Sequence, residues 1–109
     1  MTISLDQFKQ ADLRVGTVRV CEKIPDADKL LRLEVDFGPD IGVRQIVSGI
    51  AAYTAPEALV GKQLLFIVNL EPRTLRGLES AGMLLAVGEN ESFSFLIPTN
   101  AVQPGSQVR

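Results

Sequence analysis

The sequence contains no histidine and no tryptophan, and it has one cysteine, Cys21. Ser-His-Asp and Cys-His catalytic groups, and zinc sites with several cysteine or histidine ligands, therefore cannot be built from this chain. A single cysteine also excludes a disulfide framework within the chain, which fits a reducing compartment. For Cys21 itself, the role of a small buried hydrophobic residue is favoured over that of a reactive thiol.

Long hydrophobic runs and nucleotide-binding glycine motifs are also absent. No stretch approaches the length of apolar residues that spans a bilayer, and the N-terminus lacks a basic region followed by an apolar run. Neither G-x-x-x-x-G-K-[ST] nor G-x-G-x-x-G after a strand occurs, so nothing indicates a phosphate cradle. We therefore expect a soluble, cytoplasmic chain that uses no metal, nucleotide or other cofactor.

The chain has 109 residues, of which 46% are hydrophobic and 22% are charged. This is enough apolar material for one core, so we expect residues 1–109 to form a single domain. The formal net charge of −2 argues against a surface that is basic all over. Any nucleic-acid site must therefore be a local patch.

The first half of the chain predicts a short helix and three strands. Ser4 and Gln7 form the pattern of a capping box, and the helix should end before Asp12. Residues 13–24 are rich in β-branched residues, and their alternation changes phase at Gly16, where we expect a bulge or bend that lets one strand serve two halves of a curled sheet. A turn is expected over 25–29, and further strands over 31–37 and 43–48.

The second half predicts more short strands and one short helix. Thr54 and Glu57 suggest a capping box for a helix that stops at Gly61. Residues 63–70 should form a strand buried on both faces, 72–82 an irregular loop, and 83–87 and 93–97 two further strands. Many short strands, two small helices and frequent glycines favour an all-β fold, and the helix before the fourth strand favours a five-stranded OB-fold barrel.

Two groups of polar residues could carry chemistry. The acidic residues lie in turns beside proline or glycine, where turn formation and capping are favoured over acid-base or metal chemistry; they are Asp26, Asp28, Asp36 and Asp40. The other group mixes phosphate donors with side chains that can contact bases: Arg14, Lys29, Arg32, Arg44, Arg73 and Arg76, with Ser48, Asn69, Ser80 and Met83. From composition alone, solvated surface charge is the favoured interpretation of this second group.

Six separated blocks of sequence change that balance. They cover residues 12–16, 25–30, 44–51, 61–62, 69–70 and 76–85, in this order. Together they resemble the OB-fold tRNA-binding domain found at the C-terminus of bacterial methionyl-tRNA synthetases, in the endothelial monocyte-activating polypeptide II group, and as free-standing tRNA-binding proteins. The resemblance extends over almost the whole chain.

The resemblance implies a non-catalytic protein that binds tRNA by its structure, grips the outer corner of the L-shaped molecule and acts as a homodimer. Matching positions imply a tRNA-binding set of Lys29, Arg44, Ser48, Asn69, Arg73, Arg76, Ser80 and Met83. Arg32 joins this set because its strand lies on the face where OB-folds bind nucleic acid. Arginine and lysine should pair with phosphates, and Asn69 and Ser80 should donate to the RNA backbone or to base edges. Met83 either packs on an exposed base or fills the core.

The family also implies that the N-terminal helix and the C-terminal tail form the dimer interface. Two copies would double the basic patch, which reconciles RNA binding with a negative net charge. The sequence as given carries no synthetase body, so we expect a free-standing chain or an excised domain, and a separate methionyl-tRNA synthetase is a possible partner. The turn over residues 36–42 resembles CsaA, a related peptide-binding export chaperone, which is the alternative function.

Overall fold

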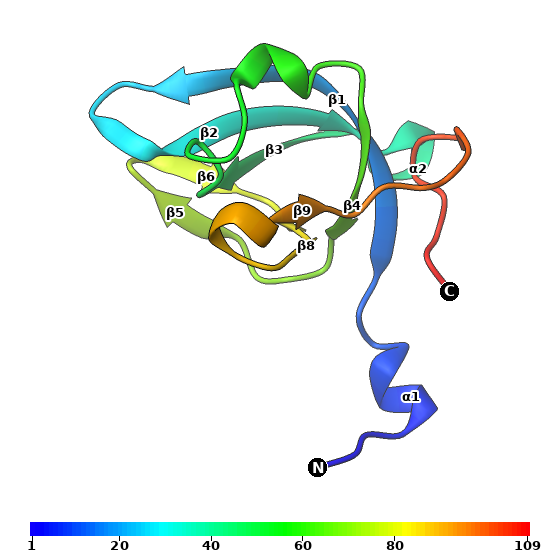
Figure 1. Ribbon diagram of the computed structural model, residues 1–109. Coiled ribbons are helices and arrows are strands. Elements are labelled where there is room, and N and C mark those ends of the chain that lie inside the picture. Colours follow the sequence, from blue (N-terminus) through cyan, green and yellow to red (C-terminus); the bar gives the residue numbers. More distant parts are fainter.

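Five antiparallel strands, with alternating apolar side chains on the long ones, build the main sheet (Figure 1). The computed structural model describes residues 1–109. The order in the sheet is β3-β2-β1-β4-β7, with the bounds β1 (Leu13–Ile24), β2 (Ala27–Asp36), β3 (Val43–Ser48), β4 (Gln63–Ile67) and β7 (Met83–Leu84). Leu31, Leu33 and Val35 alternate along β2 and are fully buried, so one face of β2 lies in the middle of the core.

The long strand β1 serves two partners, as its sequence predicted. Its first part pairs with β4 from Leu13 to Thr17, and its second part pairs with β2 from Thr17 to Ile24. The bulge, however, lies at Arg19, between the paired Val18 and Val20, and not at Gly16.

Gly16 is needed for a different reason. It stays in the ladder opposite Leu64, and a Cβ atom there would lie 2.6 Å from Cε1 of Phe37. The ring of Phe37 in turn meets that of Phe66 edge-to-face, with centroids 5.2 Å apart. The change of phase in the sequence therefore marks a close approach of backbone to an aromatic core residue.

The turn between β1 and β2 is shorter than predicted. Only Pro25 and Asp26 form it, and β2 begins at Ala27, so the predicted turn over 25–29 is wrong in its second half. Asp26 has φ of 61°, a left-handed conformation that aspartate tolerates better than most residues. The result is a tight hairpin that carries Lys29 near its tip.

Three other predictions between residues 38 and 70 need correction. A short helix, α2 (Gly38–Ile41), stands where a turn was expected, and a 3-10 turn, η1 (Pro56–Ala58), replaces the predicted capped helix. The Thr54 hydroxyl donates to the carbonyl of Ala55 at 3.0 Å and caps no helix. Strand β4 ends at Ile67 and is buried only at alternate positions, because one of its faces is half covered.

The region predicted to be irregular, residues 72–82, contains a regular hairpin. Strands β5 (Arg73–Leu75) and β6 (Leu78–Ser80) are joined by Arg76 and Gly77, with φ of 50° and 78°. Two positive φ values are typical of a two-residue hairpin turn. The strand predicted over 83–87 is divided into β7 and β8 (Ala86–Val87), and the strand predicted over 93–97 is reduced to β9 (Ser94–Phe95). The 3-10 turn η2 (Asn90–Ser92) lies between them.

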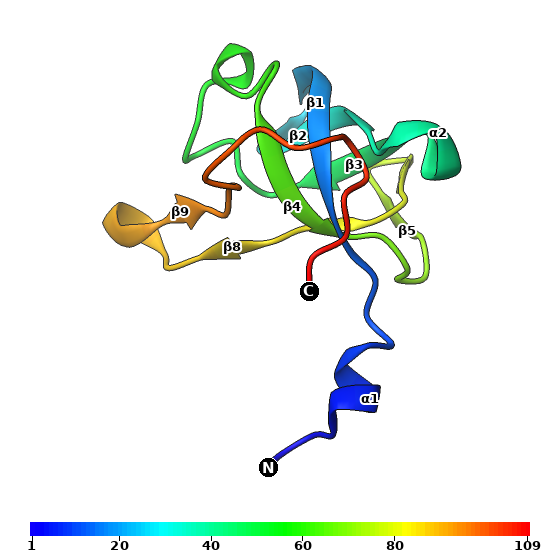
Figure 2. The ribbon, with the colours of Figure 1, turned by 90° about the vertical axis from the view of Figure 1, so that its right-hand side faces the viewer.

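Both termini lie outside the main sheet. Helix α1 (Leu5–Phe8) has the predicted capping box, in which Ser4 Oγ accepts from the amide of Gln7 at 3.1 Å, and it stands apart from the sheet (Figures 1 and 2). The C-terminal segment runs along the first part of β1, where Val108 donates to Leu13 at 2.8 Å (Figure 2). No helix is long and apolar enough to cross a membrane.

Candidate nucleic-acid interface

The tips of two hairpins meet at one end of the molecule. The β1–β2 turn lies beside the β5–β6 turn (left side of Figure 1). Residues of both turns line a cleft whose cations are Lys29 and Arg76. Both side chains are exposed and neither forms an ion pair within the chain. Asp26 and Asp28 line the same cleft, so the cleft carries charges of both signs. Lys29 and Arg76 are therefore two individual positive groups, and the cleft surface is not uniformly positive.

Three more of the predicted residues are accessible. Arg73 is exposed at the start of β5, and Ser48 is half-buried at the end of β3, opposite Leu31. Met83 lies on the edge strand β7 and is 42% exposed. Of the two roles open to Met83, core packing is therefore wrong, and its thioether is free to contact a ligand.

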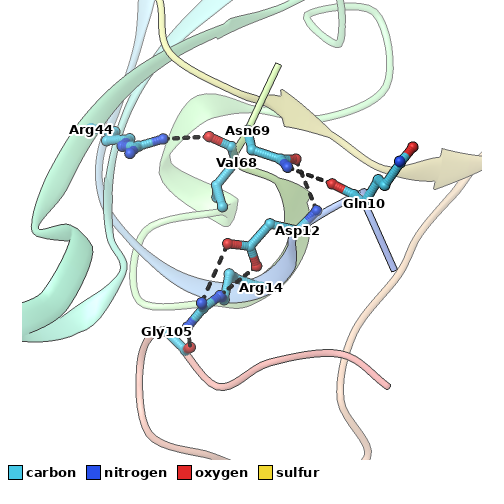
Figure 3. Close-up of polar contacts among 7 residues, drawn as sticks. All are labelled: Gln10, Asp12, Arg14, Arg44, Val68, Asn69 and Gly105. Carbon is cyan, nitrogen blue, oxygen red and sulfur yellow. Dashed lines mark hydrogen bonds and ion pairs between the residues drawn. The ribbon is translucent and has the colours of Figure 1, made fainter. Parts of the chain in front are cut away.

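Arg32 and Arg44 are half-buried and already hold partners. Arg32 pairs with Glu22 and Glu34, and its Nε donates to Gln45 at 2.9 Å. Arg44 Nη1 donates to the carbonyl oxygen of Val68 at 2.6 Å (Figure 3), which ties β3 to the end of β4. A guanidinium has five N–H donors, so both residues keep donors beyond these bonds.

Ser80 is 4% exposed, and its hydroxyl bonds only to the chain itself. The Oγ atom accepts from the amide of Val47 at 3.0 Å and donates to the carbonyl of Gly82 at 3.1 Å. These bonds hold the end of the β5–β6 hairpin against β3.

Asn69 follows the end of β4 by two residues and bonds to the N-terminal segment (Figure 3). Its Oδ1 accepts from the amide of Asp12 at 2.8 Å, and its Nδ2 donates to the carbonyl of Gln10 at 2.6 Å. The structure thus brings Lys29 and Arg76 into one cleft, and it gives Asn69 and Ser80 partners inside the chain.

Comparison with known proteins identifies the family. Residues 13–107 match the family model described as "Putative tRNA binding domain". The chain belongs to this family. The resemblance inferred from six sequence blocks is thereby confirmed, and the tRNA-binding domain extends over both hairpins, the sheet and most of the C-terminal segment.

Relatives of this tRNA-binding domain come from two kinds of protein. A methionine–tRNA ligase of Porphyromonas gingivalis is 53% identical over 108 residues, which are 98% of this chain but 16% of the ligase. A MetRS-related protein of Pyrococcus horikoshii has a TM-score of 0.90 and 38% identity, over 100% of this chain and 99% of that one. The chaperone CsaA of Bacillus anthracis has a TM-score of 0.88 and 31% identity, over the full length of both chains.

The sequence analysis missed Gln45 and considered Arg14 only as a phosphate donor, but both residues support the domain from within. Gln45 Nε2 donates to the carbonyl of Glu79 at 2.9 Å and links β3 to the hairpin. Arg14 pairs with Asp12 at 2.6 Å and donates to the carbonyl of Gly105 at 3.0 Å (Figure 3). The hydrogen bond that Arg14 donates to the Asp12 carboxylate raises the pKa of Arg14 above its ordinary value. The bonds from Gln45 to Glu79 and from Arg14 to Gly105 have no local sequence signal, because these partners are distant in the chain. The pair of Arg14 and Asp12, only two positions apart, could have been found from the sequence.

The acidic turn residues and Cys21 also have physical roles in the tRNA-binding domain. Asp36 accepts from the amide of Gly38 at 2.8 Å and pairs with Arg19, and these bonds lower the pKa of Asp36. The turn-forming role predicted for Asp36 is therefore confirmed. Cys21 packs half-buried against the core, and burial raises the pKa of its thiol. Both observations fit its predicted role as a small hydrophobic residue.

A second cleft in this domain is mostly apolar. It lies between η1, β4 and the C-terminal segment, and Leu59, Phe95 and Ile97 are among its lining residues. Ile97 is 64% exposed. The Gln63 amide bonds to both backbone groups of Val102, at 2.6 and 3.0 Å, and holds the C-terminal segment at this cleft.

Proposed function

We propose that this chain binds tRNA by its shape, as a homodimer that grips the outer corner of the molecule, and that it has no catalytic activity of its own. The proposal includes closure of the sheet into an OB-fold barrel and residence in the cytoplasm. The observation that carries it is the family match over residues 13–107, within which two exposed cations of separate hairpins line one cleft. OB-folds bind nucleic acid on strands two and three and the loops beside them.

The proposed contacts fall into two groups. Lys29, Arg73 and Arg76 neutralise phosphates, Met83 packs on an exposed base, and Ser48 bonds to the RNA backbone. The other predicted residues act mainly through the bonds that they make inside the chain: Arg32, Arg44, Asn69 and Ser80. N–H donors of Arg32 and Arg44 that these bonds do not use can also bond to RNA. Few phosphate contacts per subunit imply a modest dependence of affinity on salt.

Dimerisation is proposed to use the N-terminal arm, which we define as residues 1–11. Ile3, Leu5 and Phe8 are 58%, 66% and 43% exposed on this arm. Exposed apolar side chains that stand apart from the core are typical of an interaction surface. A symmetric pair would present two sets of cations to one tRNA, although the chain has a net charge of −2.

Cleavage footprinting of a tRNA with hydroxyl radicals tests the binding mode. We expect protected nucleotides at the outer corner of the tRNA, with a stoichiometry of two chains per tRNA from sedimentation of the complex. Protection confined to the anticodon arm or the acceptor end would overturn the binding mode. A complex with one chain per tRNA would overturn the dimer.

The chain could serve a methionyl-tRNA synthetase in trans, and we propose this as its cellular context. Support comes from the methionine–tRNA ligase relative, of which this chain matches only 16%. Co-purification of a synthetase with the tagged chain, retained after nuclease treatment, is the expected result. Loss of the synthetase after nuclease treatment would mean that only shared tRNA joins the two proteins.

A second candidate function is peptide binding by a CsaA-like export chaperone. A CsaA structure matches the chain over its full length, and the apolar cleft beside Phe95 and Ile97 favours this reading. The test is suppression of aggregation of an unfolded client protein in the presence of saturating tRNA. Undiminished suppression would support the chaperone function, and absence of suppression without tRNA would rule it out.

A further inference from the structure

Asn69 joins two parts of the chain that are far apart in sequence. Its amide bonds to the backbone of Gln10 and of Asp12, which lie 59 and 57 positions earlier. One bond uses its oxygen as acceptor and the other uses its nitrogen as donor, at 2.8 and 2.6 Å (Figure 3). We call this pair of bonds the Asn69 clamp, because the side chain holds the two peptide groups on either side of Ala11.

This clamp sits where the N-terminal arm meets the sheet. Along the arm, Gln10 donates to Gln7 at 3.2 Å and Ala11 donates to Phe8 at 3.1 Å, so backbone bonds run without a break from α1 to Ala11. On the other side, Val68 donates to the carbonyl of Asp12 at 2.9 Å, which begins the pairing with the sheet. Asn69 bridges these two bonded regions.

No packed element replaces this link. Helix α1 has no buried residue, and it stands apart from the sheet in both views (Figures 1 and 2). Below the clamp, the Asp12 carboxylate is held by Arg14, which also reaches Gly105 in the C-terminal segment. The direction of the arm therefore depends on polar bonds at its base. Asn69 makes the two side-chain bonds that join this base to the end of β4, beside the backbone bond from Val68 to Asp12.

We propose that Asn69 is a positioning residue that fixes the direction of the N-terminal arm, and that its effect on RNA affinity passes through the arm without contact with RNA. The second half rests on the proposed function; the first does not. The arm then presents Ile3, Leu5 and Phe8 in one orientation, at low entropic cost on association.

Backbone relaxation by NMR tests the first half on the full chain. Asn69→Ala leaves the amide of Asp12 and the carbonyl of Gln10 to water, because both lie at the surface. We expect order parameters over Leu5–Phe8 to fall from about 0.85 to below about 0.6, with the strands unchanged. The control is Asn100→Ala, an exposed asparagine that makes no side-chain bond within the chain, and it should leave the arm as ordered as in the wild type. An equally ordered arm in Asn69→Ala would overturn the proposal.

A double-mutant cycle tests the second half. Asn69→Ala is combined with Leu5→Asp, which damages the exposed apolar face of the arm without touching the sheet. We expect Asn69→Ala to weaken tRNA affinity several-fold in the wild-type chain, and by less than about twofold in the Leu5→Asp chain. An equal loss in both backgrounds would assign Asn69 to direct RNA contact, and no loss in the wild-type background would remove its link to RNA. Absence of tRNA binding by the wild type would refute the proposed function, while the relaxation result would stand.

Discussion

Lys29 and Arg76 line the same cleft, although they come from two different hairpins of the sequence. Each hairpin has a two-residue turn with positive φ, at Asp26 in the first and at Arg76 and Gly77 in the second. The tight turns bring the two cations to the same end of the molecule, where a phosphate could contact both.

The first prediction concerns these two cations. Lys29→Gln and Arg76→Gln should each weaken tRNA binding and reduce the slope of log affinity against log salt by about one, because each removes one phosphate contact. The measurement is a salt titration of tRNA affinity by fluorescence anisotropy. Lys62→Gln makes the same charge change beside the apolar cleft and serves as the control. Equal losses for Lys62→Gln and Arg76→Gln would show that only net charge matters.

The second prediction has the opposite sign. Asp28 lines the cleft with Lys29 and Arg76, and its carboxylate repels an incoming phosphate. Asp28→Asn should therefore strengthen tRNA binding several-fold at low salt, with the gain fading as added salt screens the charge. Glu91→Gln, in the turn η2, removes the same charge away from the cleft. A gain of the same size in Glu91→Gln, or weaker binding in Asp28→Asn, would contradict the assignment of the cleft.

The third prediction separates support from contact at Ser80. Ser80→Ala should lower the free energy of unfolding by about 1–3 kcal/mol, because the buried amide of Val47 loses its acceptor. Chemical denaturation of Ser80→Ala and of Ser94→Ala, an exposed serine whose hydroxyl bonds only to the next residue, makes the comparison. Under native conditions the folded Ser80→Ala chain should keep tRNA affinity within about twofold of the wild type. A large loss of affinity without loss of stability would make Ser80 a direct contact.

The fourth prediction follows from the lowered pKa of Asp36. Bonds from Gly38 and Arg19 favour the charged carboxylate in the folded chain. Its stabilising effect is therefore present above the unfolded pKa, about 3.9, and is lost as the pH falls through the lower folded pKa. Asp36→Asn should be less stable than the wild type at pH 6, and the difference in urea midpoint should shrink as the pH falls below the unfolded pKa. A difference that does not change between pH 6 and pH 2.5 would refute this role.

The sequence predicted those elements whose signals are local. The bounds of β1 and β3 were predicted correctly, because runs of β-branched residues end at proline or glycine. The capping box of α1 was likewise predicted from Ser4 and Gln7. The hairpin at Arg76 was missed because arginine before glycine is a weak turn signal, and only the fold supplies the strand pairing that holds it.

The candidate site could be predicted only as a set of residue types. Sequence resemblance implied a set of tRNA-binding residues, but it could not reveal which of their side chains already bond to other parts of the chain. Ser80 and Asn69 bond to residues far away in the chain, and Arg44 spends a donor on Val68. Such partners depend on the tertiary structure, so the sequence could not predict which residues are exposed cations and which support the fold.

The central claim is that the chain recognises tRNA as a shape. A gel-shift comparison of a tRNA with an unstructured RNA of equal length, at two salt concentrations, tests it most directly. We expect the chain to bind the tRNA more tightly than the unstructured RNA at both salt concentrations. The affinity for both RNAs should fall at the higher salt concentration, because phosphate contacts release counterions. Equal affinity for the two RNAs, or no binding of tRNA at low salt, would contradict it.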